Sequence, residues 1–228
     1  MSVSLYYANS LELLDDMLYE KAYSLVSQER KEKLDRIKSI KSCCQSLTCE
    51  LLLKKALFDR GLNPDSIAYS YGEHGKPFLQ AYPMVYFNFA HSGELAVCAI
   101  SSKEVGCDVE QTGKNRSNVA SRFLTQEEYR QVELMEENKK NEEIIRYWTW
   151  KESFLKAIGE GFHYPLQAFS FVKADGQIQI HQSWDKQDYY FREYDVGTDY
   201  CCTVCAQEND FAPDTQKIDL KELLMRLI

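Results

Sequence analysis

The stretch VGCDVE, residues 105–110, is typical of a buried β-strand that carries two carboxylates. Apolar residues alternate in it with Gly106, Asp108 and Glu110. Because successive strand side chains point to opposite faces, Asp108 and Glu110 project the same way. Two like charges so close repel unless water, a cation or a shared proton relieves them. A solvated strand end and a divalent-cation site both satisfy this condition, and the pattern D-x-E taken alone favours the solvated end.

The composition indicates a globular, acidic protein. The chain has 228 residues, 44% of them hydrophobic, which suits one large domain or two small ones with a real core. A net charge of −8 and a pI of about 5.2 argue against a nucleic-acid binder. The N-terminal stretch MSVSLYYANS has no signal-peptide pattern, and no apolar run approaches a membrane span. We therefore expect a cytoplasmic protein without nucleic-acid or membrane partners.

The eight cysteines are expected to be reduced thiols, since nothing indicates secretion. Cys202 and Cys205 form a C-x-x-C that could be half a zinc site or a redox pair, but no second C-x-x-C completes it. Their apolar surroundings favour cysteines that pack in the core.

The order of the predicted elements is helices, strands, helices, strands, which indicates an α+β protein with two similar halves. Helical spacing of apolar residues covers 10–27, 27–61, 124–135, 142–161 and the closing 220–228. Strand patterns cover 67–71, 84–92, 95–101, 104–111, 168–174, 177–184, 188–195 and 200–207, and a charged loop is predicted near 136–143.

Further polar residues stand near these elements. Glu152 and Lys156 lie four apart on a predicted helix and share a face. A solvated ion pair is the simpler interpretation of them alone, but the aromatic residues around them favour the wall of a site. His91 follows an apolar strand, where it could bind an anion or play a structural part. Arg30 and Lys33 belong to a run of mixed charge that is typical of a solvated helix face.

Taken together, carboxylates, a histidine and several cations suit a Mg²⁺-bound polyphosphate. In order, GKPFL, FNFAHSG, VGCDVE, FLTQEEY and WTWKESFLKAIGEG resemble the signature blocks of the surfactin-type 4′-phosphopantetheinyl transferases. The G-x-D-x-E and W-x-x-K-E-(S/A)-x-x-K blocks are highly specific as a pair, and the similarity runs from about residue 20 to about residue 205. Relatives of this length have two similar α+β halves in one chain. The resemblance therefore implies halves 1–104 and 105–228, an active site at their interface, and a monomer.

The resemblance also implies a reaction and its residues. The 4′-phosphopantetheine arm of coenzyme A would pass to a serine hydroxyl of an apo acyl- or peptidyl-carrier protein, and adenosine 3′,5′-bisphosphate would be released. Mg²⁺ would be held by Asp108, Glu110 and Glu152. Glu152 would act as base, with Lys156 on the leaving phosphate and His91 assisting. The implied coenzyme contacts are Arg30, Lys33, Ser46, Lys76, Pro77, His91, Asp108 and Lys156.

The chain departs from the family pattern at two positions, and two other functions remain open. Gln45 stands where the family often has Arg, and Ala90 where it often has Ser, so two possible coenzyme contacts are lost. Glu128 belongs to a family block, but with Thr125 it also forms a helix capping box, which we favour. The alternatives are a Mg²⁺-dependent phosphohydrolase and a carrier-protein binder without transferase activity.

Overall fold

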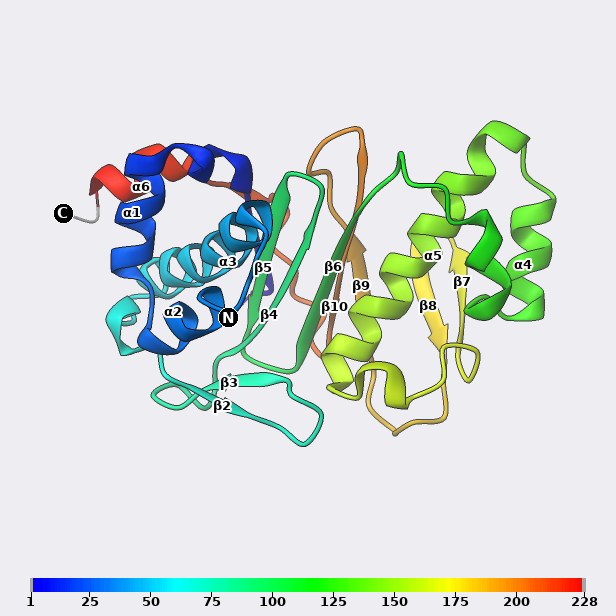
Figure 1. Cartoon of the computed structure of the whole chain (residues 1–228). Helices are drawn as coiled ribbons and strands as arrows, with labels where there is room; N and C mark the ends of the chain where they lie inside the picture. The colour runs from blue at the N-terminus through cyan, green and yellow to red at the C-terminus, as the bar shows by residue number, and fades with distance from the viewer. Residues whose placement is uncertain (1, 227–228) are drawn as a thin grey trace.

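The computed structural model describes residues 2–226. It contains the helices and strands of an α+β protein, which confirms the predicted fold class. Two sheets lie between one group of helices that includes α3 and another that includes α4 and α5 (Figure 1). The helices are α1 (Asp16–Leu25), α2 (Gln28–Leu34), α3 (Ile40–Asp59), α4 (Gln126–Glu133), α5 (Glu137–Ile158) and α6 (Leu220–Arg226), with short 3-10 turns η1 (Ser10–Leu14), η2 (Pro64–Ser66), η3 (Ser117–Arg122) and η4 (Gly161–His163).

The first sheet has the strand order β11-β1-β5-β4, and the second has the order β6-β10-β9. Their strands are β1 (Ser4–Asn9), β4 (Tyr86–Ser92), β5 (Leu95–Ser101), β11 (Gln216–Lys217), β6 (Val105–Gln111), β9 (Tyr190–Glu193) and β10 (Tyr200–Ala206). Two hairpins complete the fold, β2 (Tyr69–Tyr71) with β3 (Pro77–Leu79), and β7 (Ser170–Ala174) with β8 (Gln177–His181).

Three apolar clusters stack through the molecule. The first joins α3 to one face of the first sheet and contains Leu51 of α3 and Cys98 of β5. The second lies between the two sheets and contains Val97 of β5 and Val109 of β6. The third joins α5 to the strands beside it and contains Phe154. Strand β5 is buried along its whole length, because its alternate residues face the first and second clusters.

The boundary predicted between 104 and 105 falls between β5 and β6. The end of the chain, however, lies with the first half. Strand β11 pairs in parallel with β1, and Leu220 and Leu224 of α6 are buried in the first cluster. Figure 1 shows α6 beside α1. Residues 216–226 therefore pack against residues 1–104, although the sequence division assigns them to the second half; the predicted residues 227 and 228 of this helix lie outside the described residues.

Several predicted elements are wrong in detail. The helix expected over 10–27 is the 3-10 turn η1 followed, after Asp15, by α1. The pattern over 27–61 forms two helices, because α2 ends at Leu34 and the Ser39 side chain accepts the Ser42 N–H to start α3. The charged stretch 136–143 is the first part of α5 rather than a loop. Ion pairs at helical spacing, such as Lys140–Glu137 at 3.1 Å and Arg146–Glu142 at 2.8 Å, explain how so polar a segment forms a helix.

Other predictions from the sequence are confirmed. The strand expected over 95–101 is β5, and the one expected over 104–111 contains β6. All eight cysteines are free and buried, as expected of core residues. Within residues 2–226, no helix is both long and apolar enough to span a membrane.

Candidate active site

The predicted site lies where strand β6 packs directly on helix α5. A Cβ added at Gly106 would lie 2.1 Å from the Ser153 carbonyl oxygen and 2.3 Å from the Ala157 nitrogen. Only glycine permits this approach of strand and helix. Its consequence is that Asp108 of the strand comes within reach of the side chains on α5.

Lys156 of α5 forms its ion pair with Asp108 rather than with Glu152, its neighbour on the helix. Lys156 Nζ lies 2.6 Å from Asp108 Oδ1 and also donates to the Cys107 carbonyl oxygen at 3.2 Å. Burial lowers the pKa of Lys156, but Asp108 and Glu152 raise it further, so the net direction is upward. The ammonium therefore stays charged between the strand and the helix.

Two carboxylate oxygens in this region are buried without a hydrogen-bond partner, Asp108 Oδ2 and Glu152 Oε1. Burial raises the pKa of Asp108 to about 6, with Lys156 acting against it and Glu110 adding to it. Burial likewise raises the pKa of Glu152 to about 7, again opposed by Lys156. Each acid thus keeps one oxygen without a partner, although Lys156 already pairs with Asp108 Oδ1, and a bound cation would satisfy both free oxygens.

Glu110 differs because its oxygens already have partners. It forms an ion pair with Arg116 and accepts the Ser92 hydroxyl at 2.8 Å. Among residues 2–226, no group of three His, Cys, Asp or Glu side chains is arranged so that it could hold a metal ion without rearrangement. The donor chemistry still fits Mg²⁺, which binds carboxylate oxygens, and the two unpartnered oxygens would be satisfied by it. Glu110 would first have to release Arg116.

His91 is exposed near the end of β4. Partial loss of solvent around its ring, followed by the positive charges of Lys156 and Lys33, lowers its pKa. Lys156 belongs to the region of the carboxylates, whereas Lys33 lines a cavity beside α2. His91 therefore lies close enough to both regions to respond to their charges.

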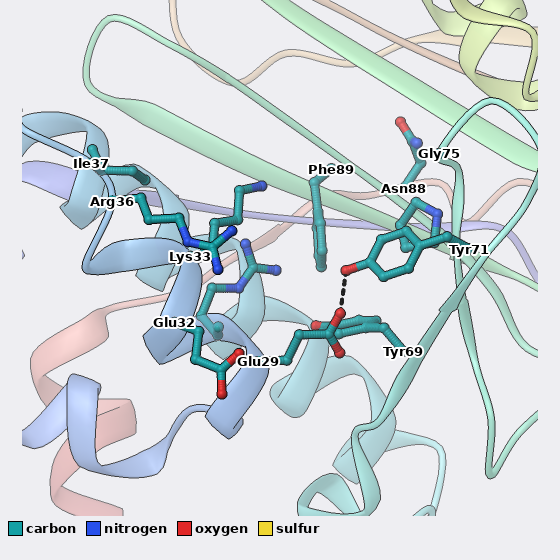
Figure 2. Close-up of a pocket in the computed structure, with 12 residues that line it drawn as sticks. Glu29, Glu32, Lys33, Arg36, Ile37, Tyr69, Tyr71, Gly75, Asn88 and Phe89 are labelled. Atoms are coloured by element: carbon teal, nitrogen blue, oxygen red, sulfur yellow. Dashed lines mark hydrogen bonds between the residues drawn. The ribbon is translucent and has the colours of Figure 1, made fainter.

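This cavity has a volume of about 680 Å³ and lies between α2, the β2–β3 hairpin and β4. Figure 2 shows Lys33 and Arg36 on one side of it and Tyr71 with Asn88 on the other. The lining residues are Glu29, Arg30, Glu32, Lys33, Arg36, Ile37, Tyr69, Tyr71, Gly75, Pro77, Asn88 and Phe89. The three carboxylates do not line it, but the Asn88 side chain accepts the Cys107 N–H at 3.0 Å, one residue before Asp108. The cavity wall and the carboxylate strand are thus joined directly.

Arg30 lines the cavity but is only 8% exposed, so it does not belong to a solvated face. Its Nε lies 3.0 Å from Oε2 of the fully buried Glu50, and its NH1 donates to the Ser46 hydroxyl at 3.0 Å. Tyr69 also donates to Glu50, at 2.9 Å. Burial and the charge of Arg30 lower the pKa of Lys33, and Cys49 opposes them.

Lys76 points away from this lining set. Its Nζ contacts Glu104 at 2.5 Å, the Ala157 carbonyl oxygen at 2.6 Å and the Val105 carbonyl oxygen at 3.2 Å. It therefore ties the start of β6 to the end of α5, while the adjacent Pro77 lines the cavity.

The remaining predicted positions have structural partners. Gln45 donates to the Gly93 carbonyl oxygen at 3.0 Å, and Ala90 is buried between the sheets. The capping box of Thr125 and Glu128 is confirmed, and Glu128 also forms a buried ion pair with Lys151 at 3.0 Å. Reasoning from the sequence missed four residues of the site, whose roles depend on contacts that no local pattern reveals: Glu50, Asn88, Ser92 and Arg116.

Comparison with known proteins shows which family the chain is similar to. The sequence model described as "4′-phosphopantetheinyl transferase superfamily" matches residues 104–205. A 4′-phosphopantetheinyl transferase of Bacillus subtilis is 31% identical over 207 residues, which is 90% of this chain and 92% of that protein. The 4′-phosphopantetheinyl transferase Sfp of Bacillus subtilis strain 168 is 30% identical with the same coverage. A solved holo-(acyl-carrier-protein) synthase of Bacillus anthracis, in complex with CoA (3′,5′-ADP), is 15% identical and covers 45% of this chain and 92% of its own, with a TM-score of 0.40.

These relatives are transferases, and the chain is therefore an enzyme of the same class. The identity and coverage of the Bacillus relatives make the assignment specific: the chain belongs to the 4′-phosphopantetheinyl transferase family, and its resemblance to the surfactin-type members is confirmed.

Proposed function

We propose that the chain transfers the 4′-phosphopantetheine arm of coenzyme A to a serine hydroxyl of an apo acyl- or peptidyl-carrier protein, with adenosine 3′,5′-bisphosphate as the second product. The observation that carries this proposal is the pair of buried, unpartnered oxygens Asp108 Oδ2 and Glu152 Oε1, near a cavity whose lining includes Lys33 and Arg36. Such oxygens suit a divalent cation, and a cavity of about 680 Å³ suits a ligand the size of a coenzyme.

Asp108, Glu110 and Glu152 are the residues that would hold Mg²⁺. When bound, the ion would neutralise the pyrophosphate of coenzyme A and polarise its oxygens. Asp108 would share its charge between the ion and Lys156, which lies 2.6 Å from Asp108 Oδ1. Glu110 would contribute once its contact with Arg116 is broken.

Glu152 would accept the proton of the serine hydroxyl, and Lys156 would donate a hydrogen bond or a proton to the leaving phosphate. Glu152, one helical turn before Lys156 on α5, is proposed to act as the base for the serine hydroxyl, directly or through water. The serine oxygen bonds to the phosphorus that carries the pantetheine as the bond from that phosphorus to the bridging oxygen breaks. Lys156 remains protonated and would donate to the departing phosphate, with His91 placed to donate to the remaining oxygens.

The cavity would hold the nucleotide end of the coenzyme. Lys33 and Arg30 are proposed to contact the 3′-phosphate, with Lys33 supplying more of the charge because Glu50 neutralises Arg30. Pro77 would contact the nucleotide directly. Ser46 would act by orienting Arg30, and Lys76 by holding the end of α5.

We further propose that the enzyme works as a cytoplasmic monomer, since one chain supplies β6, α5 and the cavity together. A net charge of −8 supports a protein partner rather than nucleic acid or an anionic membrane.

The test is incubation of the purified protein with coenzyme A, Mg²⁺ and a panel of apo carrier proteins, followed by intact-mass measurement of each carrier. A mass gain equal to one phosphopantetheine arm is expected, and it should disappear with EDTA or when the acceptor serine of the carrier is replaced by alanine. Cleavage of coenzyme A without a carrier would instead indicate a phosphohydrolase. Carrier binding with no mass gain at any Mg²⁺ concentration would indicate a protein that only binds carriers.

A further inference from the structure

Arg116 lies among the predicted metal ligands, and the proposed reaction does not use it. Its guanidinium pairs with Glu110 Oε1 and lies over the Trp148 ring, with Cζ 4.8 Å from the ring centroid. Burial is the main cause of the raised pKa values of Asp108 and Glu152, and the charge of Arg116 acts against burial at both. One cation therefore acts on all three carboxylates.

The position of Arg116 is built into the fold. Its main-chain N–H donates to Asn141 Oδ1 at 3.0 Å, and Asn141 Nδ2 donates to the carbonyl oxygens of Thr112 at 3.0 Å and Lys114 at 3.1 Å. These bonds fasten the turn after β6 to α5. The ring of Trp148, over which the Arg116 guanidinium lies, belongs to α5. Trp148 is four residues before Glu152, so Trp148 and Glu152 share a face of that helix.

We propose that Arg116 is an internal counter-cation that occupies Glu110 in the metal-free protein and thereby sets the affinity of the carboxylates for a divalent cation. This inference rests on the metal assignment made in the proposed function. A divalent ion and a guanidinium that share one carboxylate repel each other, so the ion binds more weakly while Arg116 remains in place. Arginine suits this part because it stays charged at all physiological pH values and stacks on an aromatic ring. The metal requirement then depends on how readily Arg116 leaves Glu110.

The experiment measures Mn²⁺ binding to the full chain, without coenzyme or carrier, from the electron paramagnetic resonance signal of free Mn²⁺. Arg116→Gln should bind Mn²⁺ at least about fivefold more tightly than the unaltered protein, because a positive charge beside the ion is removed. Arg116→Lys, which keeps the charge but loses the planar stacking, should lie between the two. Lys114→Gln is the matched control: its ammonium lies 3.8 Å from the same carboxylate, but its side chain is 53% exposed, so solvent screens it and the affinity should change less than about twofold.

Asp108→Asn separates the possible outcomes, since it removes a predicted ligand. Tighter binding in Arg116→Gln that is lost again when Asp108→Asn is added supports the inference. Equal or weaker binding in both Arg116 variants, with a loss in Asp108→Asn, overturns the inference but leaves the metal assignment standing. An affinity that Asp108→Asn does not change overturns both. Thermal melting of each variant shows that the compared proteins are folded.

Discussion

Lys156 and Asp108 form an ion pair whose two members depend on each other. The Asp108 side chain is 8% exposed and that of Lys156 is 27% exposed. A buried pair of this kind contributes little compared with apolar packing, but removal of one member leaves the other charge without compensation. In this enzyme the same lysine is also proposed to act on the leaving phosphate, so stability and turnover should both respond to its loss.

Lys156→Met is therefore expected to lower turnover at least about a hundredfold, the usual scale for loss of a positioned acid or base. It should also lower the free energy of unfolding by roughly 1–3 kcal/mol in metal-free protein, since Asp108 Oδ1 remains buried without its partner. Single-turnover transfer to a carrier protein and thermal melting measure the two effects. Lys103→Met, at an exposed position, is the control. A Lys156→Met rate within about threefold of the original would show that the lysine only balances charge.

Glu152 should make the metal-free protein sensitive to pH. Its folded-state pKa of about 7 lies above the ordinary value, so the stability that this group contributes is present at low pH and is lost as pH rises through 7. Glu152→Gln cannot ionise. With EDTA present, its melting temperature relative to the unaltered protein should therefore rise between pH 4.5 and 7.5. For the exposed control Glu73→Gln the difference should stay constant. A constant difference for Glu152→Gln as well would contradict burial of an uncompensated acid.

Lys33 offers a test of the coenzyme contact. Lys33→Gln should weaken coenzyme A more than 3′-dephospho-coenzyme A, because the lost charge is proposed to face the 3′-phosphate. Glu32→Gln is the matched control on the same helix, since Glu32 lines the cavity with opposite charge and should not weaken either ligand. Binding is measured by calorimetry. Equal weakening of both ligands by Lys33→Gln would mean that this lysine serves only the general charge of the cavity.

Single side chains differ in how far the sequence could place them. A strand period and a helix period predicted that Asp108 and Glu110, and Glu152 and Lys156, share a face. Their proposed place in one site came from the resemblance to a family. The partners of the site residues could not be predicted. Glu50 reaches Arg30 from 20 positions away, and Asn88 reaches Cys107 from 19 away, contacts that exist only in the folded chain.

At the scale of elements, the contact between β6 and α5 positions the groups proposed to be catalytic. Gly106→Ala would place a methyl group against main-chain atoms of Ser153 and Ala157, which cannot rotate away. The helix must then move, at a cost of about 3 kcal/mol or more. Because small displacements of catalytic groups cost about a hundredfold, turnover should fall further than stability suggests.

Gly113→Ala provides the comparison, because nothing lies within 4 Å of a Cβ at that position. Its melting temperature and transfer rate should remain near those of the original protein. Gly106→Ala with a normal transfer rate would show that the exact distance between strand and helix does not matter for the reaction.

The sequence predicted elements well where burial imposes a period and less well where charge dominates. Strand β5 was predicted over its full length because every residue in it is apolar or small and buried. The start of α5 was missed, because Glu136, Lys139 and Lys140 resemble a loop in composition while their ion pairs at spacing three support a helix. The break between α2 and α3 was missed because Leu34, Ile37 and Ile40 keep a helical spacing of apolar residues across Ser39, which caps α3.

The whole molecule is held together by an apolar layer between its two sheets. Val97 and Ala99 of β5 face Val105 and Val109 of β6 in one buried cluster. Lys76 adds a polar link from the first half to the end of α5. The two halves predicted from the repeated order of elements therefore share a core. Each half taken alone would expose apolar residues of this cluster to solvent.

This arrangement predicts that the halves do not fold separately. Fragment 1–104 would expose the inner face of the first sheet and would lack α6, whose Leu220, Leu223 and Leu224 are buried in its core. Losing that burial removes on the order of 1.5–3 kcal/mol per large apolar side chain, which is a large part of the stability of a domain. Expressed alone, the fragment should show no cooperative thermal transition by circular dichroism. Co-expression with 105–228 should restore a folded complex and transferase activity, whereas 105–215, which lacks β11 and α6, should restore much less. A cooperative transition in fragment 1–104 alone would show that the core of the first half does not depend on the end of the chain.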